Sequence, residues 1–193
     1  SIVAQDIRYV VQGASSSAVG IALLGAIEKH NSRNPGKEIV YLNYAAQAPV
    51  MTNAQCSFWH FRTDANSDMK IEAMAAHIAK QSGVKKVFLL NPNYASGQEV
   101  SKAARELLAK KRPDIEIVGD DFHPLGQVKD YSPYMAKIKR AGADTVITAD
   151  FGADLALIVR AARDSGLGVD FYTLNANNFG VPGAMGAAGE GRV

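Results

Sequence analysis

Hydrophobic residues follow two spacings along this chain. Short runs rich in Val, Ile, Leu, Tyr and Phe are separated by longer stretches in which apolar residues recur every three or four positions. The short runs predict strands at residues 8–12, 38–42, 57–62, 86–91, 116–119, 144–149 and 170–174. The longer stretches predict helices at residues 16–30, 68–82, 97–111, 131–141 and 153–165. Strand and helix therefore alternate along nearly the whole sequence.

Several predicted strands are almost continuous apolar runs, which is typical of sheets buried on both faces. Their alternation with helices predicts parallel βαβ units in a doubly wound α/β fold. Residues 43–63 interrupt the alternation, because they carry no long helical pattern. A long loop is usually functional or hides a short strand, and we place a strand at 57–62. Gly83 ends the next helix and a fresh βαβ series follows, so we expect a boundary near residues 80–84.

The composition narrows the class of protein further. The chain has 193 residues, of which 47% are hydrophobic and 21% charged, so it can form a substantial core. The 21 basic residues almost balance the 19 acidic ones, which argues against a nucleic-acid-binding protein. No apolar run approaches the roughly 18 residues that cross a membrane. The single cysteine, Cys56, forms no internal disulfide.

Sequence motifs of catalysis are absent. There is no phosphate-binding loop, no G-x-G-x-x-G and no G-x-S-x-G, and the glycine-rich segment at 180–191 has the wrong spacing for phosphate. The four histidines lack the spacing of metal ligands. Asp120, Asp121, Asp150 and Asp154 are expected at strand ends and helix N-termini, as caps. We therefore expect that the protein is not an enzyme and that it has no cofactor or metal site.

Polar turns follow the predicted strands, at the edge where open α/β sheets bind ligands. The first strand leads into Gly13-Ala-Ser-Ser-Ser17, whose hydroxyls, N–H groups and helix dipole suit a carboxylate, although capping by one serine is the simpler alternative. Later turns at residues 43–47, 91–98, 149–152 and 174–179 combine amides, hydroxyls and aromatic rings. These groups can hold a small molecule but offer neither a metal set nor a nucleophile–base pair.

Seven short segments stand in a distinctive order along the chain. They are Gly13-Ala-Ser-Ser-Ser17, Ala45-Ala-Gln-Ala-Pro49, residues 58–63 with their Phe-Arg-Thr, Gly83-Val-Lys-Lys-Val87, Ser96-Gly-Gln98, Lys137-Ile-Lys-Arg-Ala-Gly-Ala-Asp-Thr-Val146 and Gly189-Glu190. In this order they resemble the periplasmic binding proteins of the leucine/isoleucine/valine type, the solute receptors of branched-chain amino acid ABC transporters. The resemblance spans nearly the whole chain.

The resemblance implies a two-lobed type I periplasmic-binding-protein fold, in which two α/β lobes close on a ligand. Residues 1–82 would form the second half of the first lobe, and residues 83–193 most of the second. The chain is expected to be a fragment, because both of its ends read as parts of longer elements. The family further implies a periplasmic location, capture of a small-molecule ligand, delivery to an ABC transporter permease, and a monomer when intact.

Ten positions of this sequence match ligand-contacting positions of the family. First-lobe hydroxyl, amide and main-chain groups would grip a ligand carboxylate, and second-lobe polar and aromatic side chains would cover the ligand. The ten positions are Gly13, Ser15, Ser16, Ala45, Gln47, Asn93, Tyr94, Ser96, Phe151 and Asn175.

Asn175 indicates the chemistry of the ligand. Amino-acid binders of the family carry an acidic residue near this position, which pairs with the ligand's ammonium. An amide supplies no charge to offset a buried ammonium. We therefore expect an organic acid without an α-amino group, such as an aromatic acid, stacked on Tyr44, Tyr94 or Phe151.

Three alternatives stay open at the level of sequence. In the first, the ligand is an amino acid or amide, and Asp150 serves its ammonium. In the second, the chain is the ligand-sensing domain of a signalling receptor, which a transmembrane helix and signalling domain beyond Val193 would reveal. The third, an α/β enzyme such as a dehydrogenase or hydrolase, needs a phosphate loop or nucleophile motif that this sequence lacks.

Overall fold

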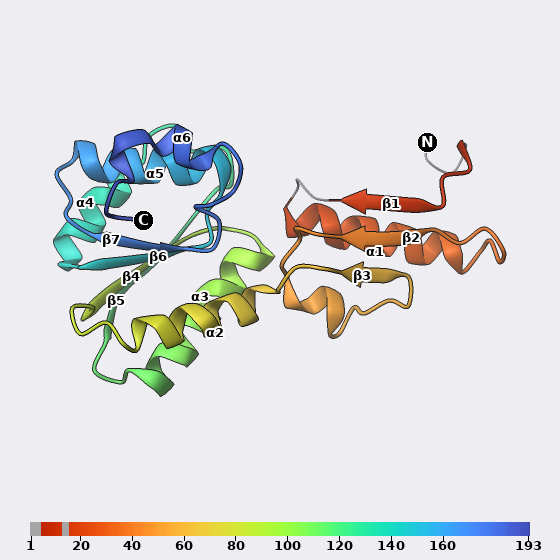
Figure 1. Ribbon diagram of the computed structural model, residues 1–193, viewed down its shortest axis with the longest axis horizontal. Coiled ribbons are helices and arrows are strands. Elements are labelled where there is room, and N and C mark those ends of the chain that lie inside the picture. The colour runs from red at the N-terminus through yellow and green to blue at the C-terminus, as the bar shows by residue number, and fades with distance from the viewer. Residues whose placement is uncertain (1–4, 13–15) are drawn as a thin grey trace. The chain divides into compact units, whose positions relative to one another are not determined.

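Two compact units make up the computed structural model, which describes residues 5–12 and 16–193 (Figure 1). Unit 1 comprises Ser1–Met69 and unit 2 comprises Lys70–Val193. Each unit contains its own parallel sheet, which confirms the predicted α/β class. Within the described part of the chain, no helix is both long and apolar enough to cross a bilayer.

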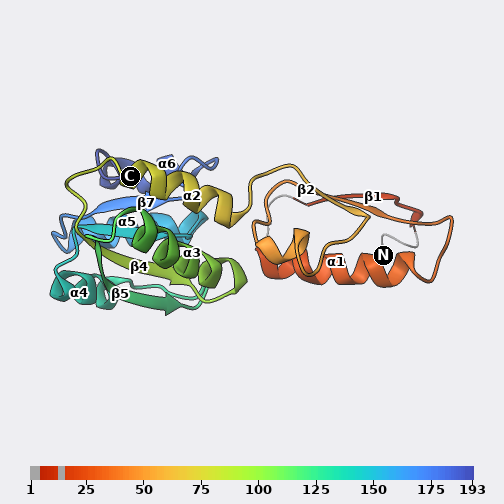
Figure 2. The same cartoon turned by 90° about the horizontal axis from the view of Figure 1, so that it is seen from below.

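Unit 1 contains a three-stranded sheet in the order β1-β2-β3, with β1 at Tyr9–Gln12, β2 at Val40–Asn43 and β3 at His60–Arg62. Helix α1, Ser17–Asn31, packs on one face of this sheet (Figure 2). The buried residues of α1 recur every three or four positions, and they are Ser17, Gly20, Leu24, Ile27 and Asn31. A short 3-10 helix, η2 at Pro49–Thr52, carries Met51 into the same core.

The other face of the unit 1 sheet carries exposed apolar side chains. The strand register places Val11, Leu42 and Phe61 in one row across the sheet. Val11 is 63% exposed and Phe61 is 51% exposed, and Tyr9 on β1 is 68% exposed. Unit 1 therefore has a helix-covered face and an open apolar face.

Unit 2 is built on a four-stranded parallel sheet in the order β5-β4-β6-β7. Its strands are β4 at Lys86–Pro92, β5 at Glu116–His123, β6 at Thr145–Thr148 and β7 at Asp170–Thr173. Helices α2 at Ser67–Ile78 and α3 at Ala95–Lys111 cover one face of the sheet. Helices α4 at Ser132–Ala141, α5 at Gly152–Asp164 and α6 at Val181–Met185 cover the other face (Figure 1).

Consecutive side chains of β4 enter two different cores. Val87 and Leu89 pack with α2 and α3, whereas Phe88 and Leu90 pack with α4 and α5. This alternation explains why the sequence of β4 is apolar at every position from 87 to 90, because both faces of a central strand are buried. The doubly wound arrangement is therefore confirmed in unit 2.

The division between the units falls after Met69 rather than near residues 80–84. Helix α2 packs Ile71, Ala75 and Ile78 into the core of unit 2, so most of it belongs with the second sheet. The sequence pattern also misses three short helices, at Pro49–Thr52, Val181–Met185 and Gly186–Ala188. Each is too short to show a helical period.

Strand β5 is longer than its apolar segment, and this corrects the expectation for two aspartates. Asp120 and Asp121 lie inside β5 rather than at helix N-termini. As β5 is an edge strand, its side chains can reach solvent-exposed partners. Asp120 pairs with Arg105 at 2.9 Å, and Asp121 pairs with Lys137 at 2.6 Å.

Candidate functional site

The turn after β2 in unit 1 is held by the buried side chain of Asn43, the last residue of that strand. Asn43 Oδ1 accepts the N–H groups of Ala45 and Ala46 at 3.1 and 2.8 Å. Asn43 Nδ2 donates to the Ala46 carbonyl at 3.0 Å and lies 3.2 Å from His60 Nε2. A single amide thus fixes the main chain at the carboxyl edge of the sheet.

Ser17, the first residue of α1, fastens the next two residues of the same loop. Its Oγ accepts the N–H groups of Gln47 and Ala48, both at 3.2 Å, and the residue is 2% exposed. The sequence predicts that the serine run at residues 15–17 is a carboxylate site or a helix cap. Its third member instead binds the main chain of a loop thirty residues away, a role that local sequence does not reveal.

The structure constrains the five candidates of unit 1 differently. Gly13 and Ser15 lie outside the described residues. Ser16 is the N-cap residue of α1 and is half-buried, but its side chain makes no capping hydrogen bond. The N–H groups of Ala45 and Gln47 already donate to side chains of the unit. A carboxylate bound here would therefore have to displace a partner to use either N–H group.

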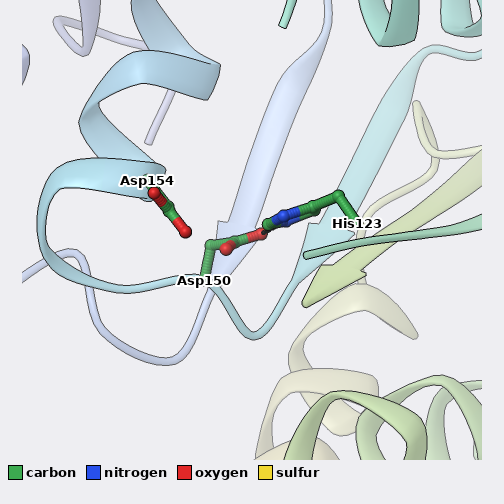
Figure 3. Close-up of side chains that lie close together, drawn as sticks. All are labelled: His123, Asp150 and Asp154. Atoms are coloured by element: carbon green, nitrogen blue, oxygen red, sulfur yellow. Dashed lines mark hydrogen bonds and ion pairs between the residues drawn. The ribbon is translucent and has the colours of Figure 1, made fainter. Parts of the chain in front are cut away.

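In unit 2, side chains from three elements meet at the carboxyl end of the sheet (Figure 3). His123 ends β5, Asp150 follows β6, and Asp154 lies in the first turn of α5. His123 and Asp150 are fully buried, and Asp154 is 6% exposed. His123 Nε2 lies 3.0 Å from Asp150 Oδ2, and Thr148 Oγ1 donates to the same oxygen at 2.8 Å. Asp154 Oδ2 accepts the Gly126 N–H at 2.7 Å.

Burial and pairing act on the His123–Asp150 pair in opposite directions. Burial by itself lowers the pKa of His123, but the hydrogen bond and charge of Asp150 outweigh it, so the pKa of the imidazole is raised. Burial raises the pKa of Asp150, and the bond to His123 offsets only part of that rise. Both shifts favour a proton on the pair.

Two buried asparagines hold the turn that carries Asp150. Asn91 Oδ1 accepts the Ala149 N–H at 2.7 Å. Asn175 Nδ2 donates to the carbonyls of Ala149 and Asp150 at 3.1 and 3.3 Å. The Asn175 amide thus fixes the β6–α5 turn from the end of β7, and Asn91 fixes it from β4.

The turn after β4 brings more candidates to this edge. Tyr94 is the N-cap residue of α3, and Ser96 is buried in the first turn of that helix. Burial raises the pKa of Tyr94, a hydrogen bond with Ser96 opposes the rise, and the nearby Asp150 charge adds to it. Asn93 is exposed, and its Oδ1 accepts a hydrogen bond from Gln98 at 3.0 Å.

Phe151 and Gly97 complete the edge. Phe151 directly follows Asp150 as the half-exposed N-cap residue of α5. Gly97 allows α3 to start close to the end of β4, because a Cβ there would lie 2.0 Å from the Pro92 carbonyl oxygen. The structure therefore gathers four candidates around the Asp150 turn, namely Tyr94, Ser96, Phe151 and Asn175.

The fold and these edges define the class of open parallel α/β proteins, in which ligands bind outside the carboxyl ends of the strands. Comparison with known proteins narrows the class to one family. The model of the family described as periplasmic binding protein matches residues 2–191. The chain belongs to this periplasmic binding protein family, as the seven sequence segments predicted.

Relatives and solved structures agree with the family. A Leu/Ile/Val-binding protein homolog 4 of Brucella abortus is 34% identical over 99% of this chain and 45% of its own length. The leucine-, isoleucine-, valine-, threonine- and alanine-binding protein of Brucella ovis, in a closed conformation, is 32% identical with a TM-score of 0.81, over 97% of this chain and 47% of that one. The chain thus spans about half the length of these relatives.

A solute-binding protein of an R. palustris ABC transporter, solved with benzoate, has a TM-score of 0.82. It is 21% identical to this chain, and the match covers 97% of this chain and 49% of that protein. At this identity the likeness concerns the fold alone. Of these two solved proteins, the first is named for the amino acids that it binds and the second was solved with benzoate.

Proposed function

We propose that this chain is part of the solute-binding component of an ABC transporter, a periplasmic monomer that captures a small organic acid and presents it to a membrane permease. Family membership and the polar carboxyl edges of both sheets support this proposal. Unit 1 is assigned to the first lobe of the family fold and unit 2 to the second.

The observation that carries the choice of ligand is the burial of negative charge at the edge of unit 2. Asp150 is fully buried and Asp154 is 6% exposed, so neither offers an open carboxylate to a solute. Among the candidates around this turn, Asn175 is an uncharged amide bonded to main-chain carbonyls. A ligand ammonium would thus lose its hydration without gaining an accessible counter-charge. A carboxylate ligand without an α-amino group, such as an aromatic acid, carries no ammonium and so avoids this particular cost.

Calorimetric titration of the intact protein tests the ligand class. We expect heat and saturation with benzoate-type acids and none with leucine. Phe151→Ala should weaken binding of an aromatic acid by about tenfold, because stacking on a ring is lost. The matched control is Phe179→Ala, since Phe179 is fully exposed and should not contribute. Tight binding of leucine, with no response to aromatic acids, would overturn the proposal.

An amino-acid ligand is the second candidate, and one atom favours it. Asp150 Oδ1 is buried and makes no hydrogen bond within the described residues. A side-chain movement that exposed this oxygen would give an ammonium its partner. Asp150→Asn distinguishes the two cases, because it should reduce affinity for an amino acid by about 100-fold or more and leave affinity for an aromatic acid nearly unchanged.

A further inference from the structure

The cluster of His123, Asp150 and Asp154 has more lone pairs than hydrogen-bond donors. One ligand atom from each residue can be chosen so that the three lie within 4.8 Å of one another, and all three residues are buried. Figure 3 shows the Asp154 carboxylate turned toward Asp150, with His123 on the opposite side of Asp150. Between them, Asp150 Oδ1 makes no hydrogen bond within the described residues, although it is shielded from water. A buried carboxylate oxygen facing a second carboxylate requires a proton or a cation.

The contacts of His123 Nδ1 bear on whether Nε2 of the same ring can bind a ligand. Nδ1 lies 3.4 Å from the Pro124 carbonyl oxygen and 3.3 Å from the Tyr131 hydroxyl. With the ring hydrogen on Nδ1, where the Pro124 carbonyl can accept it, Nε2 is free to bind an ion beside Asp150 Oδ2, 3.0 Å away. Metal-binding histidines in proteins are commonly oriented in this way, by a carbonyl at the second nitrogen.

We propose that His123, Asp150 and Asp154 bind one divalent cation of the zinc or manganese type. A neutral imidazole with two carboxylates carries a charge of −2, which one such ion neutralises. One nitrogen and two carboxylate oxygens are ligands that both ions accept. The separation of 3.0 Å between Nε2 and Oδ2 suits two neighbouring ligands of a single ion. Because metal-binding nitrogen and carboxylate atoms must be deprotonated, binding of the ion would release any proton held there.

The proposed ion differs from the transported solute in place and in role. The cluster includes Asp150, which directly precedes Phe151, and Thr148 and Tyr131 are further neighbours. The exposed residues Gly126 and Pro124 belong to a loop that contacts the cluster through the Gly126 N–H and the Pro124 carbonyl, so we take this loop as the side from which the ion enters. A bound ion would tie the end of β5 to the β6–α5 turn.

Zinc and manganese titrations of the intact, EDTA-treated protein test the proposal without any solute. We expect about one ion per chain with micromolar or tighter affinity, a higher Tm in its presence, and proton release seen as a buffer-dependent binding heat. Asp154→Asn and His123→Gln should abolish the tight site. Asp120→Asn is the matched control, because Asp120 is a β5 carboxylate paired with Arg105 outside the cluster.

Two results would overturn the inference. The first is a folded wild-type protein that takes up neither ion, in which case bound protons neutralise the cluster. The second is equal uptake by Asp154→Asn, which would place the ion elsewhere. Because the first result concerns the wild-type protein, poor folding of a variant cannot obscure it. Failure of the ion site also leaves the solute titrations unaffected, so the two proposals fail separately.

Discussion

The two units position a carboxyl edge by the same device but differ in how fully their sheets are covered. In unit 1, Asn43 at the end of β2 binds the main chain of the following turn, and in unit 2, Asn91 near the end of β4 binds the β6–α5 turn. Both asparagines are fully buried. The unit 2 sheet has helices on both faces, whereas the unit 1 sheet has an open apolar face. Each unit thus positions its edge with a buried amide, and we expect the stability of each unit to depend on how fully both faces of its sheet are covered.

Separating the units tests this contrast most severely. A polypeptide of residues 66–193 retains all of α2 and both cores of unit 2, so we expect it to unfold cooperatively in urea. A polypeptide of residues 1–69 is expected not to fold, since a chain of this size with one apolar face uncovered buries too little surface. Circular dichroism and dye binding to exposed apolar surface provide the measurement. Cooperative unfolding of residues 1–69 would show that the open face costs little.

Glycines at helix–sheet contacts should give the next largest effect. Gly97→Ala places a Cβ 2.0 Å from the Pro92 carbonyl oxygen, so we expect a loss of about 3 kcal/mol in the free energy of unfolding. Gly25 is the matched control in α1, because a Cβ there meets nothing within 4 Å. Gly25→Ala should stabilise unit 1 by about 0.5–1 kcal/mol. If both variants behave alike in chemical denaturation, the close approach of α3 is not a constraint.

The two buried asparagines compare the units directly. Asn43→Ala and Asn91→Ala each leave buried main-chain or hydroxyl groups without partners, at a cost of about 1–3 kcal/mol. Asn43→Ala should cost more, because two N–H groups lose their acceptor at once. Urea unfolding measures the difference, with exposed Asn53→Ala as the control. If Asn53→Ala and Asn43→Ala change the free energy of unfolding equally, the turn after β2 does not depend on the Asn43 amide.

Removing the surface carboxylate of Asp114 in unit 2 should give the smallest effect on stability, and the size of this effect should depend on pH. Hydrogen bonds from Arg112 and Lys85 hold the pKa of Asp114 well below its usual value of 3.8. A lowered folded-state pKa contributes stability above pH 3.8, and this stability is lost as the pH falls through the folded-state pKa. Asp114→Asn should therefore lower the Tm by at most a few degrees at neutral pH and converge with wild type in strong acid. A constant difference at every pH would exclude this linkage.

Hydrophobic spacing predicts most of the strands and helices of the fold, but it predicts the ends of the strands less accurately. All seven predicted strands exist, and the apolar run of β4 correctly indicated a strand buried on both faces. The end of β5 was missed because Asp120 and Asp121 look like a turn, although they lie in an edge strand with ion-pair partners. Apolar spacing reports burial, so it cannot detect a polar edge strand.

The sequence predicted at which edge of the sheet the candidate residues lie, but not which side chains contact one another there. Tyr94, Phe151 and Asn175 each follow a strand, and the rule for sheet edges places them together. The His123 cluster was not predictable, because strand order brings it together. His123 ends β5 and Asp150 follows β6, and these two strands flank β4 in the sheet. The sequence separates the two residues by 27 positions and does not reveal which strands are neighbours.

The parallel pairing of β4 has a consequence for the time course of folding. Val87 pairs with Thr145, so one ladder of this central strand cannot form until a much later segment of the chain is available. Parallel sheets need such distant contacts for every strand, and their loop-closure entropy slows folding. During synthesis, Val87 and Leu89 can be shielded early by α2, which precedes β4, and by α3, which follows it directly and which Gly97 allows to start close to the strand. Phe88 and Leu90 face α4 and α5, which are made later, so this face of β4 would stay uncovered longest in the nascent polypeptide.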